Sequence, residues 1–132
     1  MKTSYDLLWS TFLAKCKVDD LDLPNSEEAI YDTIQNAVLA FNNKLEDDLL
    51  ADNTTELLNR ELSGDELLLL SHCIRIIILE NQLIYFSASF SPFTKEIGAR
   101  NLGNQMNRLE YLIDREDDKI HSIIVKMTDD FI

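Results

Sequence analysis

Residues 63–86 constrain the fold more than any other segment of the chain. Ser63 and Glu66 have the spacing of a capping box, which predicts that a helix begins there. The apolar residues that follow cover every face of this helix, as in a helix that either spans a membrane or lies at the centre of a packed domain. His72 and Arg75 interrupt the run, so it falls short of the roughly 20 continuous apolar residues that a bilayer requires. We therefore predict a core helix and no membrane partner.

The composition favours an all-α fold. The chain has 132 residues, enough for one domain with a modest core, and only three glycines and two prolines. A sandwich of short strands needs more turn residues than that. We expect a small bundle of about four helices, with a long apolar central helix and a long C-terminal helix. The single domain covers residues 1–132, with helices near 4–16, 26–42, 64–86 and 98–127.

The C-terminal helix is predicted from apolar residues that recur at alternating spacings of four and three, which is typical of a packing seam. The members of this repeat are Leu102, Met106, Leu109, Ile113, Ile120, Ile123 and Met127. Glu116 is the one break in the repeat. The seam predicts that this helix lies along another helix over most of its length.

The segment between residues 42 and 62 carries mixed signals. Residues 52–55 (Asp-Asn-Thr-Thr) are typical of a loop, whereas the leucines on either side favour burial. We expect short helical turns that pack onto the bundle here.

The charge is strongly acidic and unevenly distributed. The net charge is −12, and residues 1–66 contain fifteen acidic and five basic residues, a balance of −10. Nucleic-acid binders need a basic surface, so this charge argues against a protein that grips phosphates. It suits a surface that repels DNA, or one that binds a basic protein.

One group on the predicted C-terminal helix has the spacing of metal ligands. Asp117, Asp118 and His121 place two carboxylates and an imidazole on one helical face. Arg115 and Lys119 are adjacent ion-pair partners, and we interpret the group as a solvated face. The sequence therefore predicts no metal site.

Other signatures of catalysis or ligand binding are missing from the sequence. Asp19, Asp20 and Asp22 lack the glycine and the terminal glutamate of a calcium-binding EF-hand loop. No glycine-rich phosphate loop, nucleophile elbow or zinc-spaced cysteine pair occurs. We expect no enzyme and no cofactor.

The histidines and cysteines are interpreted as structural residues. His72 and His121 have no partner motif in the sequence. Cys16 and Cys73 lie in apolar helical settings, where a thiol is usually a small buried hydrophobe. A disulfide between the two cysteines stays an open alternative.

Four aromatic residues follow the core helix: Tyr85, Phe86, Phe90 and Phe93, with Pro92 among them. In one interpretation they close the end of the bundle. In the other they form an exposed contact for a partner, because aromatic residues are enriched at interfaces. The sequence leaves both interpretations open.

Several stretches resemble, in order, a family of phage proteins. Residues 5–13 look like its opening aromatic helix, and residues 59–67 (NRELSGDEL) resemble its motif N-x-x-L-[ST]-x-[DE]-E-[IL] ahead of a very apolar helix. Residues 79–84 are similar to the end of that helix, and residues 100–112 look like the start of the long closing helix. The family is that of the small helical head-to-tail connector (adaptor, or neck) proteins of long-tailed bacteriophages of low-GC Gram-positive bacteria. Residues 85–94 depart from its pattern.

The resemblance implies a structural virion protein at the head–tail junction, made in the host cytoplasm. It implies a ring of about twelve copies of the chain on the phage portal protein, a closed cyclic assembly. The ring lengthens the DNA channel and presents a platform to the next neck or tail-completion protein.

The residues agree with this role. Neighbouring copies would share the burial of the apolar helix, and DNA phosphates pass acidic walls without being bound. The expected channel-lining or partner-facing acids are Asp19, Asp20, Asp22, Glu46, Asp47 and Asp48, and the expected partner contacts are Tyr85, Phe86, Phe90 and Phe93.

An alternative comes from another class of protein. A small acidic phage inhibitor could mimic DNA and occupy the nucleic-acid site of a host defence nuclease. This reading explains the net charge of −12 equally well. It explains the apolar helix less well, because a monomeric decoy has no need of shared burial. A decoy would be a monomer or dimer, whereas a connector forms rings or binds a portal.

Overall fold

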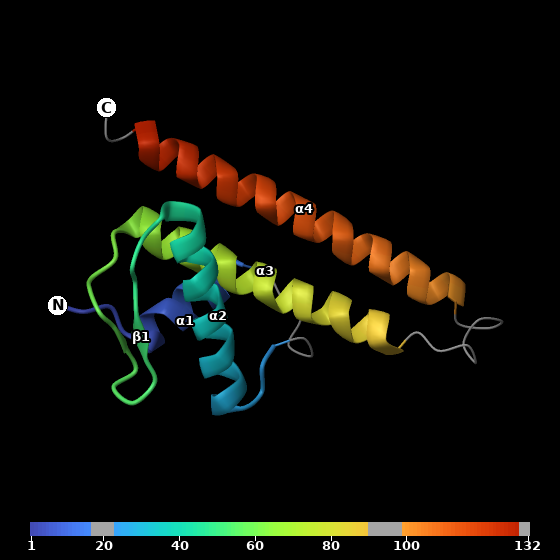
Figure 1. Cartoon of the computed structure of the whole chain (residues 1–132), viewed down its shortest axis with the longest axis horizontal. Helices are drawn as coiled ribbons and strands as arrows, with labels where there is room; N and C mark the ends of the chain where they lie inside the picture. The colour runs from blue at the N-terminus through green and yellow to red at the C-terminus, as the bar shows by residue number, and fades with distance from the viewer. Residues whose placement is uncertain (17–22, 90–98, 130–132) are drawn as a thin grey trace.

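A computed structural model describes residues 1–16, 23–89 and 99–129, without the side chains of residues 86–89, 99–103, 105 and 129. Within these ranges the chain forms four helices and one short hairpin (Figure 1). The helices are α1 (Tyr5–Lys15), α2 (Glu27–Leu45), α3 (Gly64–Ser89) and α4 (Ala99–Asp129), and the strands are β1 (Ala51–Asp52) and β2 (Leu57–Leu58). The predicted all-α bundle, with a long apolar central helix and a long C-terminal helix, is confirmed.

The first three helices begin at serine caps. Ser4 Oγ accepts a hydrogen bond from Leu7 N, and Ser26 Oγ accepts one from Ala29 N. At the start of α3, Ser63 N donates to Glu66 Oε1 and Glu66 N donates to Ser63 Oγ. This is the reciprocal capping box that the sequence predicts, and it satisfies backbone donors that a helix start otherwise leaves unpaired.

Helix α3 lies at the centre of the fold. In Figure 1, α4 runs along one side of α3, α2 crosses in front of α3, and α1 lies on the side away from α4; all three pack on α3. Leu69, Leu70 and Ile74 of α3 are fully buried. The segment Gly64–Tyr85 is long and apolar enough to cross a membrane, but half of it is buried inside the fold. Because the other three helices pack on it, α3 is the core helix of this domain.

The seam predicted for α4 faces α3. Leu109, Ile120 and Ile123 are buried, and Met106, Ile113 and Met127 are partly buried. The Leu102 side chain lies outside the described residues. Glu116, the break in the repeat, is also buried, at 2% exposure.

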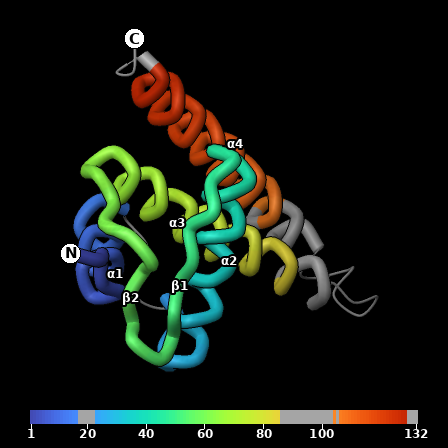
Figure 2. Tube along the Cα trace, turned by 60° about the vertical axis from the view of Figure 1, so that its left-hand side comes forward, coloured from blue at the N-terminus to red at the C-terminus, as the bar shows by residue number. Residues whose placement is uncertain are grey.

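The expectation of helical turns in residues 42–62 is wrong, although the segment does pack onto the bundle through Leu49 and Leu58. Helix α2 continues to Leu45, and the chain then forms the antiparallel β1–β2 hairpin in place of helical turns (Figure 2). Asp52 makes the turn, since its side chain accepts from Thr54 N and its carbonyl oxygen accepts from Glu56 N. An aspartate that bonds the backbone two residues later favours a tight turn over a helix. Leu49 and Leu58 are fully buried, which anchors the hairpin to the core.

Among the described residues, two that are not glycine have a left-handed backbone, Glu46 (φ 53°) and Glu56 (φ 55°). Glu46 is the C-cap of α2, a position where glycine is favoured because it has no Cβ. The Glu46 side chain is exposed, whereas the Glu56 carboxylate accepts a hydrogen bond from the Tyr31 hydroxyl.

We predict that Glu46→Gly stabilises the fold by about 0.5–1 kcal/mol, because it relieves the left-handed strain without removing a contact. Glu56→Gly is the matched control, and it should not stabilise, because it removes the bond to Tyr31. Thermal unfolding followed by circular dichroism measures both. A lower melting temperature for Glu46→Gly than for the wild type would contradict the prediction.

Candidate functional site

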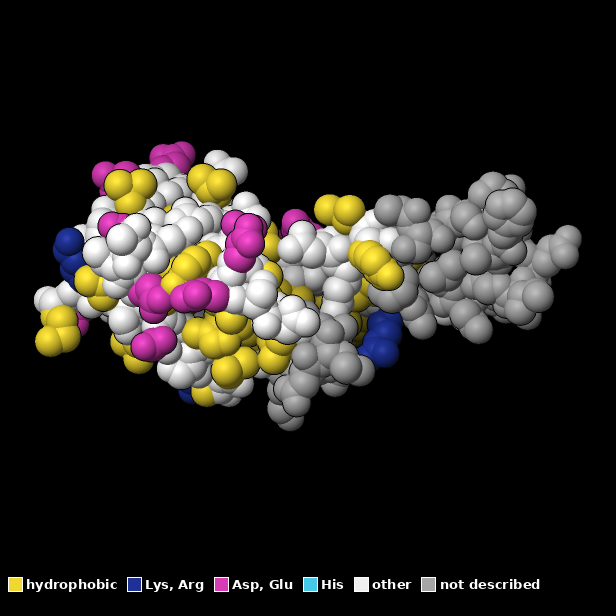
Figure 3. All heavy atoms as spheres, turned by 90° about the horizontal axis from the view of Figure 1, so that it is seen from below, with side chains coloured by type: hydrophobic (Ala, Val, Ile, Leu, Met, Phe, Trp, Pro, Cys, Tyr) yellow, Lys and Arg dark blue, Asp and Glu magenta, His cyan; other side chains and the backbone are white. Residues whose placement is uncertain are grey.

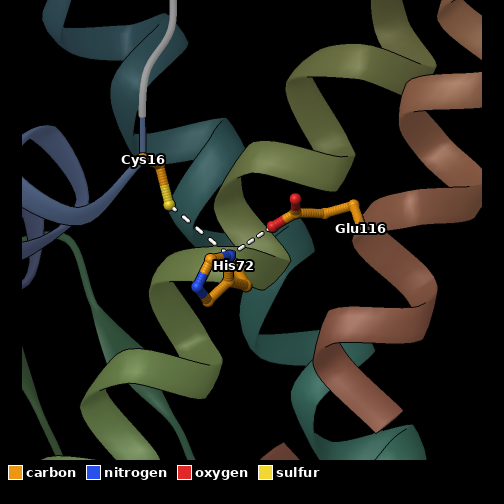
Figure 4. Close-up of side chains that lie close together, drawn as sticks. All are labelled: Cys16, His72 and Glu116. Carbon is orange, nitrogen blue, oxygen red and sulfur yellow. Dashed lines mark hydrogen bonds and ion pairs between the residues drawn. The ribbon is translucent and has the colours of Figure 1, made fainter. Parts of the chain in front are cut away.

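Three buried side chains that can ligate a metal meet where α1, α3 and α4 come together (Figure 4). Cys16 is the C-cap residue of α1, His72 lies in α3 and Glu116 lies in α4. Their exposed fractions are 3%, 2% and 2%. Among the described residues, this Cys16–His72–Glu116 cluster is the one group of three such residues whose donor atoms converge.

The Nδ1 atom of His72 is the centre of the cluster. It lies 3.7 Å from Cys16 Sγ and forms a hydrogen bond with Glu116 Oε1. All three donor atoms lie within 4.8 Å of one another. The second carboxylate oxygen of Glu116 accepts from Arg75 Nη1 at 3.1 Å, and the Cys16 thiol lies 3.7 Å from the Ser71 carbonyl oxygen. Glu116 therefore bridges two side chains that lie one turn apart on α3.

The charge balance of the cluster depends on Arg75. A buried carboxylate is stable in a protein only when a partner compensates its charge. The Arg75 guanidinium provides that charge, with a side chain that is 23% exposed. Its Nε atom is buried and has no hydrogen-bond partner among the described residues. Arg75 therefore compensates Glu116 while part of its own hydrogen-bonding capacity stays unused.

The cluster lacks the geometry of a nucleophilic relay. In such a relay the thiol and the carboxylate contact opposite nitrogens of the imidazole, whereas Cys16 and Glu116 both face Nδ1 of His72. Burial, followed by the negative charge of Glu116, raises the pKa of the Cys16 thiol to about 11. A thiol with that pKa is protonated near neutral pH and is a poor nucleophile. The cluster instead offers one sulfur, one nitrogen and one oxygen donor, the types that bind Zn²⁺.

The sequence contained signals for this cluster, but not its pairing. Glu116 broke the seam of the C-terminal helix, and His72 and Arg75 interrupted the apolar helix. Each of these residues is polar in an otherwise apolar pattern. A polar residue at such a position is expected to form a buried polar contact. His72 and Glu116 are separated by 44 residues along the chain. Only the packing of α4 on α3 identifies them as partners.

Three of the six predicted acids lie in the described part of the chain. Glu46 and Asp48 are exposed, as a channel wall or partner surface requires. Asp47 instead lies 2.6 Å from Arg60 Nη2, and the same nitrogen lies 2.7 Å from Glu66 Oε2. Asp47 is therefore engaged within the fold and is not free to face a channel or a partner. The remaining three, Asp19, Asp20 and Asp22, lie outside the described residues.

The ion pairs with Arg60 help to lower the pKa values of two carboxyl groups, Asp47 and Glu66. Partial burial raises the pKa of Asp47, but the backbone N–H of Asp48 and the charge of Arg60 lower it more, so the net pKa lies below its usual value. Burial likewise raises the pKa of Glu66, and the bonds from Arg60 and from the backbone of Ser63 bring it below its usual value. Both carboxylates thus stabilise the fold in their ionised form.

Of the four aromatic residues predicted to contact a partner, only the Tyr85 side chain lies within the described part of the chain. Tyr85 is 68% exposed at the end of α3. The side chains of Phe86, Phe90 and Phe93 lie outside the described residues, so the two interpretations of the aromatic group stay open.

The group considered as a metal site on α4 is a solvated face. Asp117, Asp118 and His121 are exposed, and Asp117 forms a long ion pair of 3.9 Å with Lys44. The donor atoms of this group do not converge as those of the Cys16–His72–Glu116 cluster do. Both cysteines are free and buried, which decides against a disulfide between them.

Comparison with known proteins places the chain among prophage proteins. A family model described as "YomZ prophage protein" matches residues 1–129, which include all four helices. The SPbeta prophage-derived protein YomZ of Bacillus subtilis (strain 168) is 45% identical over 130 residues, covering 98% of this chain and 99% of the relative. No solved structure matches. These matches do not test the resemblance to head-to-tail connectors, which stays a prediction.

We predict that neither cysteine reacts quickly with a thiol reagent in the native protein near neutral pH. Burial is the main cause that raises the pKa of Cys16 to about 11 and that of Cys73 to about 12. Both thiols are also shielded from solvent. Ellman's reagent should label both thiols rapidly in guanidinium chloride and slowly without it. Rapid labelling of either thiol in the folded protein would contradict the described burial.

We predict that acid weakens the fold partly through Asp47 and Glu66. Their ionised forms stabilise the fold above their usual pKa values of 3.8 and 4.5, and this contribution is lost as the pH falls through the lowered folded values. Asp47→Asn should lower the free energy of unfolding at neutral pH by about 1 kcal/mol and flatten its acid dependence. Asp48→Asn, at the exposed neighbouring position, should change it by less than about 0.5 kcal/mol. Urea unfolding over a pH series measures both, and equal effects of the two substitutions would refute the role of the ion pair.

Proposed function

The chain belongs to the YomZ prophage protein family, and from this premise we propose that it is a non-enzymatic adaptor of the phage neck. In this proposal, copies of the chain assemble into a ring on the portal protein at the head–tail junction of the virion. The ring extends the DNA channel and receives the next neck or tail-completion protein. DNA passes through the ring without sequence-specific binding.

The observation that carries the proposal is the incomplete burial of α3. About half of the apolar segment Gly64–Tyr85 is buried, most of the rest is partly buried, and its exposed apolar residues lie at its C-terminal end. In Figure 1 the C-terminal end of α3 and the N-terminal part of α4 extend beyond α1 and α2. At its C-terminal end, α3 therefore has fewer helices around it. Ile84 and Tyr85 are 66% and 68% exposed there. An exposed apolar surface of this kind typically marks a site of protein association.

Neighbouring copies in a ring provide the missing cover in the proposed assembly. In a ring, every subunit presents the same surface to its neighbour. The apolar surface of each chain is therefore buried against the next subunit. Burying a side chain such as isoleucine contributes about 1.5–3 kcal/mol. The portal serves as the template on which the subunits meet, so a monomer in solution is compatible with the proposal.

The acidic charge supports the channel role. Figure 3 shows acidic side chains spread over the end of the molecule that carries α1, α2 and the hairpin. The exposed acids of these elements and their connections are Asp6, Glu27, Glu28, Asp32, Glu46, Asp48, Asp52 and Glu61. A surface of this charge repels phosphates and leaves DNA free to move. A DNA-mimic inhibitor has the same need for acids but gives no role to the uncovered end of α3.

We predict that Ile84→Ser weakens assembly on the portal about tenfold, because it removes an apolar anchor from the proposed contact. Leu39→Ser is the matched control, since Leu39 is 65% exposed but lies on α2. Neither substitution should change the free energy of unfolding by more than about 0.5 kcal/mol, because both side chains are exposed. Co-sedimentation with the portal protein of the same phage, with ring formation viewed by electron microscopy, measures assembly.

Two results would overturn the proposal. One is the absence of any binding between the wild-type chain and its portal. The other is tight, salt-sensitive binding to a host nuclease by a chain that stays monomeric, which is the behaviour of a DNA mimic.

A further inference from the structure

We propose that Cys16, His72 and Glu116 form a binding site for one divalent transition-metal ion, with Zn²⁺ as the best fit. The ligands are the Cys16 sulfur, the Nδ1 atom of His72 and a carboxylate oxygen of Glu116. This site is independent of the assembly proposed above. It lies inside the subunit and needs no partner.

The spacing of one donor pair already suits a zinc ion, and the other donors lie near enough to reach it by side-chain movement. Zn–N and Zn–O distances of about 2.0–2.2 Å and a Zn–S distance of about 2.3 Å place tetrahedral donors roughly 3.3–3.6 Å apart. The Cys16 sulfur and His72 Nδ1 are already 3.7 Å apart, and all three donors lie within 4.8 Å of one another. The hydrogen bond between His72 Nδ1 and Glu116 Oε1 must break, and these two atoms must move apart, for an ion to enter between them.

The donor types select the class of metal. A soft thiolate and a borderline imidazole, with one carboxylate, suit Zn²⁺ and Co²⁺, and the sulfur and nitrogen donors disfavour Mg²⁺ and Ca²⁺. Three protein ligands leave one of the four zinc positions for water. On binding, the thiol proton of Cys16 passes to solvent, because the thiolate is the ligand.

The bonding capacity of His72 Nδ1 is the reason why a metal ion would suit this cluster. His72 Nδ1 holds either one proton or one lone pair, so it cannot bond the thiol and the carboxylate in the same way at the same time. A cation between the three donors satisfies all of them together. Without a cation, Nδ1 pairs with Glu116 and the thiol turns to the Ser71 carbonyl oxygen.

Arg75 is the group that an incoming cation must displace. It pairs with Glu116 Oε2 at 3.1 Å and would be repelled by a metal ion. Its side chain is 23% exposed, so the guanidinium can turn toward solvent, and the bound ion would then replace it as the positive partner of Glu116. The two anionic ligands, Cys16 and Glu116, then neutralise the divalent ion.

The bound ion would join three helices at one point. Cys16 ends α1, while His72 and Glu116 lie well inside α3 and α4. A ligand that binds the folded chain and not the unfolded chain raises stability in proportion to the logarithm of its concentration. Metal binding is therefore expected to raise the melting temperature.

Cobalt titration of the whole chain, purified without a histidine tag and treated with a chelator, tests the site. Co²⁺ should bind with one-to-one stoichiometry and give the near-ultraviolet charge-transfer absorption of a cobalt thiolate, and Zn²⁺ should displace it. An equimolar amount of Zn²⁺ should raise the melting temperature, whereas the same amount of Mg²⁺ should not. A wild-type chain with no thiolate absorption and no zinc-dependent stabilisation would overturn the proposal.

Matched variants locate the site. Cys16→Ala should abolish the absorption, while Cys73→Ala, the other buried cysteine, should keep it. His121→Asn should also keep it, since the exposed α4 group takes no part. Absorption that survives Cys16→Ala, or is lost in His121→Asn, would refute the assignment. If Cys16→Ala fails to fold, the Cys73→Ala variant is the test, because Cys16 is then the one thiol left in the chain. Absorption in that variant would assign the thiolate to Cys16, and loss of the absorption would exclude Cys16 as the ligand.

Discussion

The apolar surface of α3 is the constraint on which the rest of the structure depends. A helix that is apolar on all sides cannot turn any face to water without cost. The other three helices each pack on α3 more than they pack on one another. Leu58 of the hairpin and Leu49 just before it are buried in the same core. The domain is therefore organised around one element, and its other parts are arranged by the need to cover it.

The same constraint separates the molecule into a covered part and an uncovered part. Around Leu70 and Ile74, α3 is enclosed and fully buried. Toward its C-terminal end α3 is more exposed: Glu80 and Asn81 are polar and exposed, and Ile84 beyond them is an exposed apolar residue. The acids are spread mainly over the elements around the covered part. The enclosed part of α3 and the exposed acids thus lie in the same half of the molecule.

The sequence predicted the helices well because their signals are local. The capping box at Ser63 and the repeat that ends at Met127 each depend on residues within a few turns of one another. The hairpin was missed because strands of two residues are too short to show an alternating pattern, and because its turn depends on the bonds of Asp52. The buried cluster could not be predicted as a unit. Its members come from three helices, and their distances follow from packing.

The buried position of Glu116 has a consequence for the alignment of α4. A seam with spacings of four and three nearly repeats itself every seven residues, so sliding α4 along α3 by one heptad would again place apolar residues against apolar residues. Such a slide would leave the Glu116 carboxylate facing hydrocarbon, away from His72 and Arg75. It would also leave the Arg75 guanidinium without its carboxylate partner. Separating a buried ion pair such as Arg75–Glu116 costs several kcal/mol. One glutamate thus fixes the register of two long helices that hydrophobic packing alone would leave ambiguous.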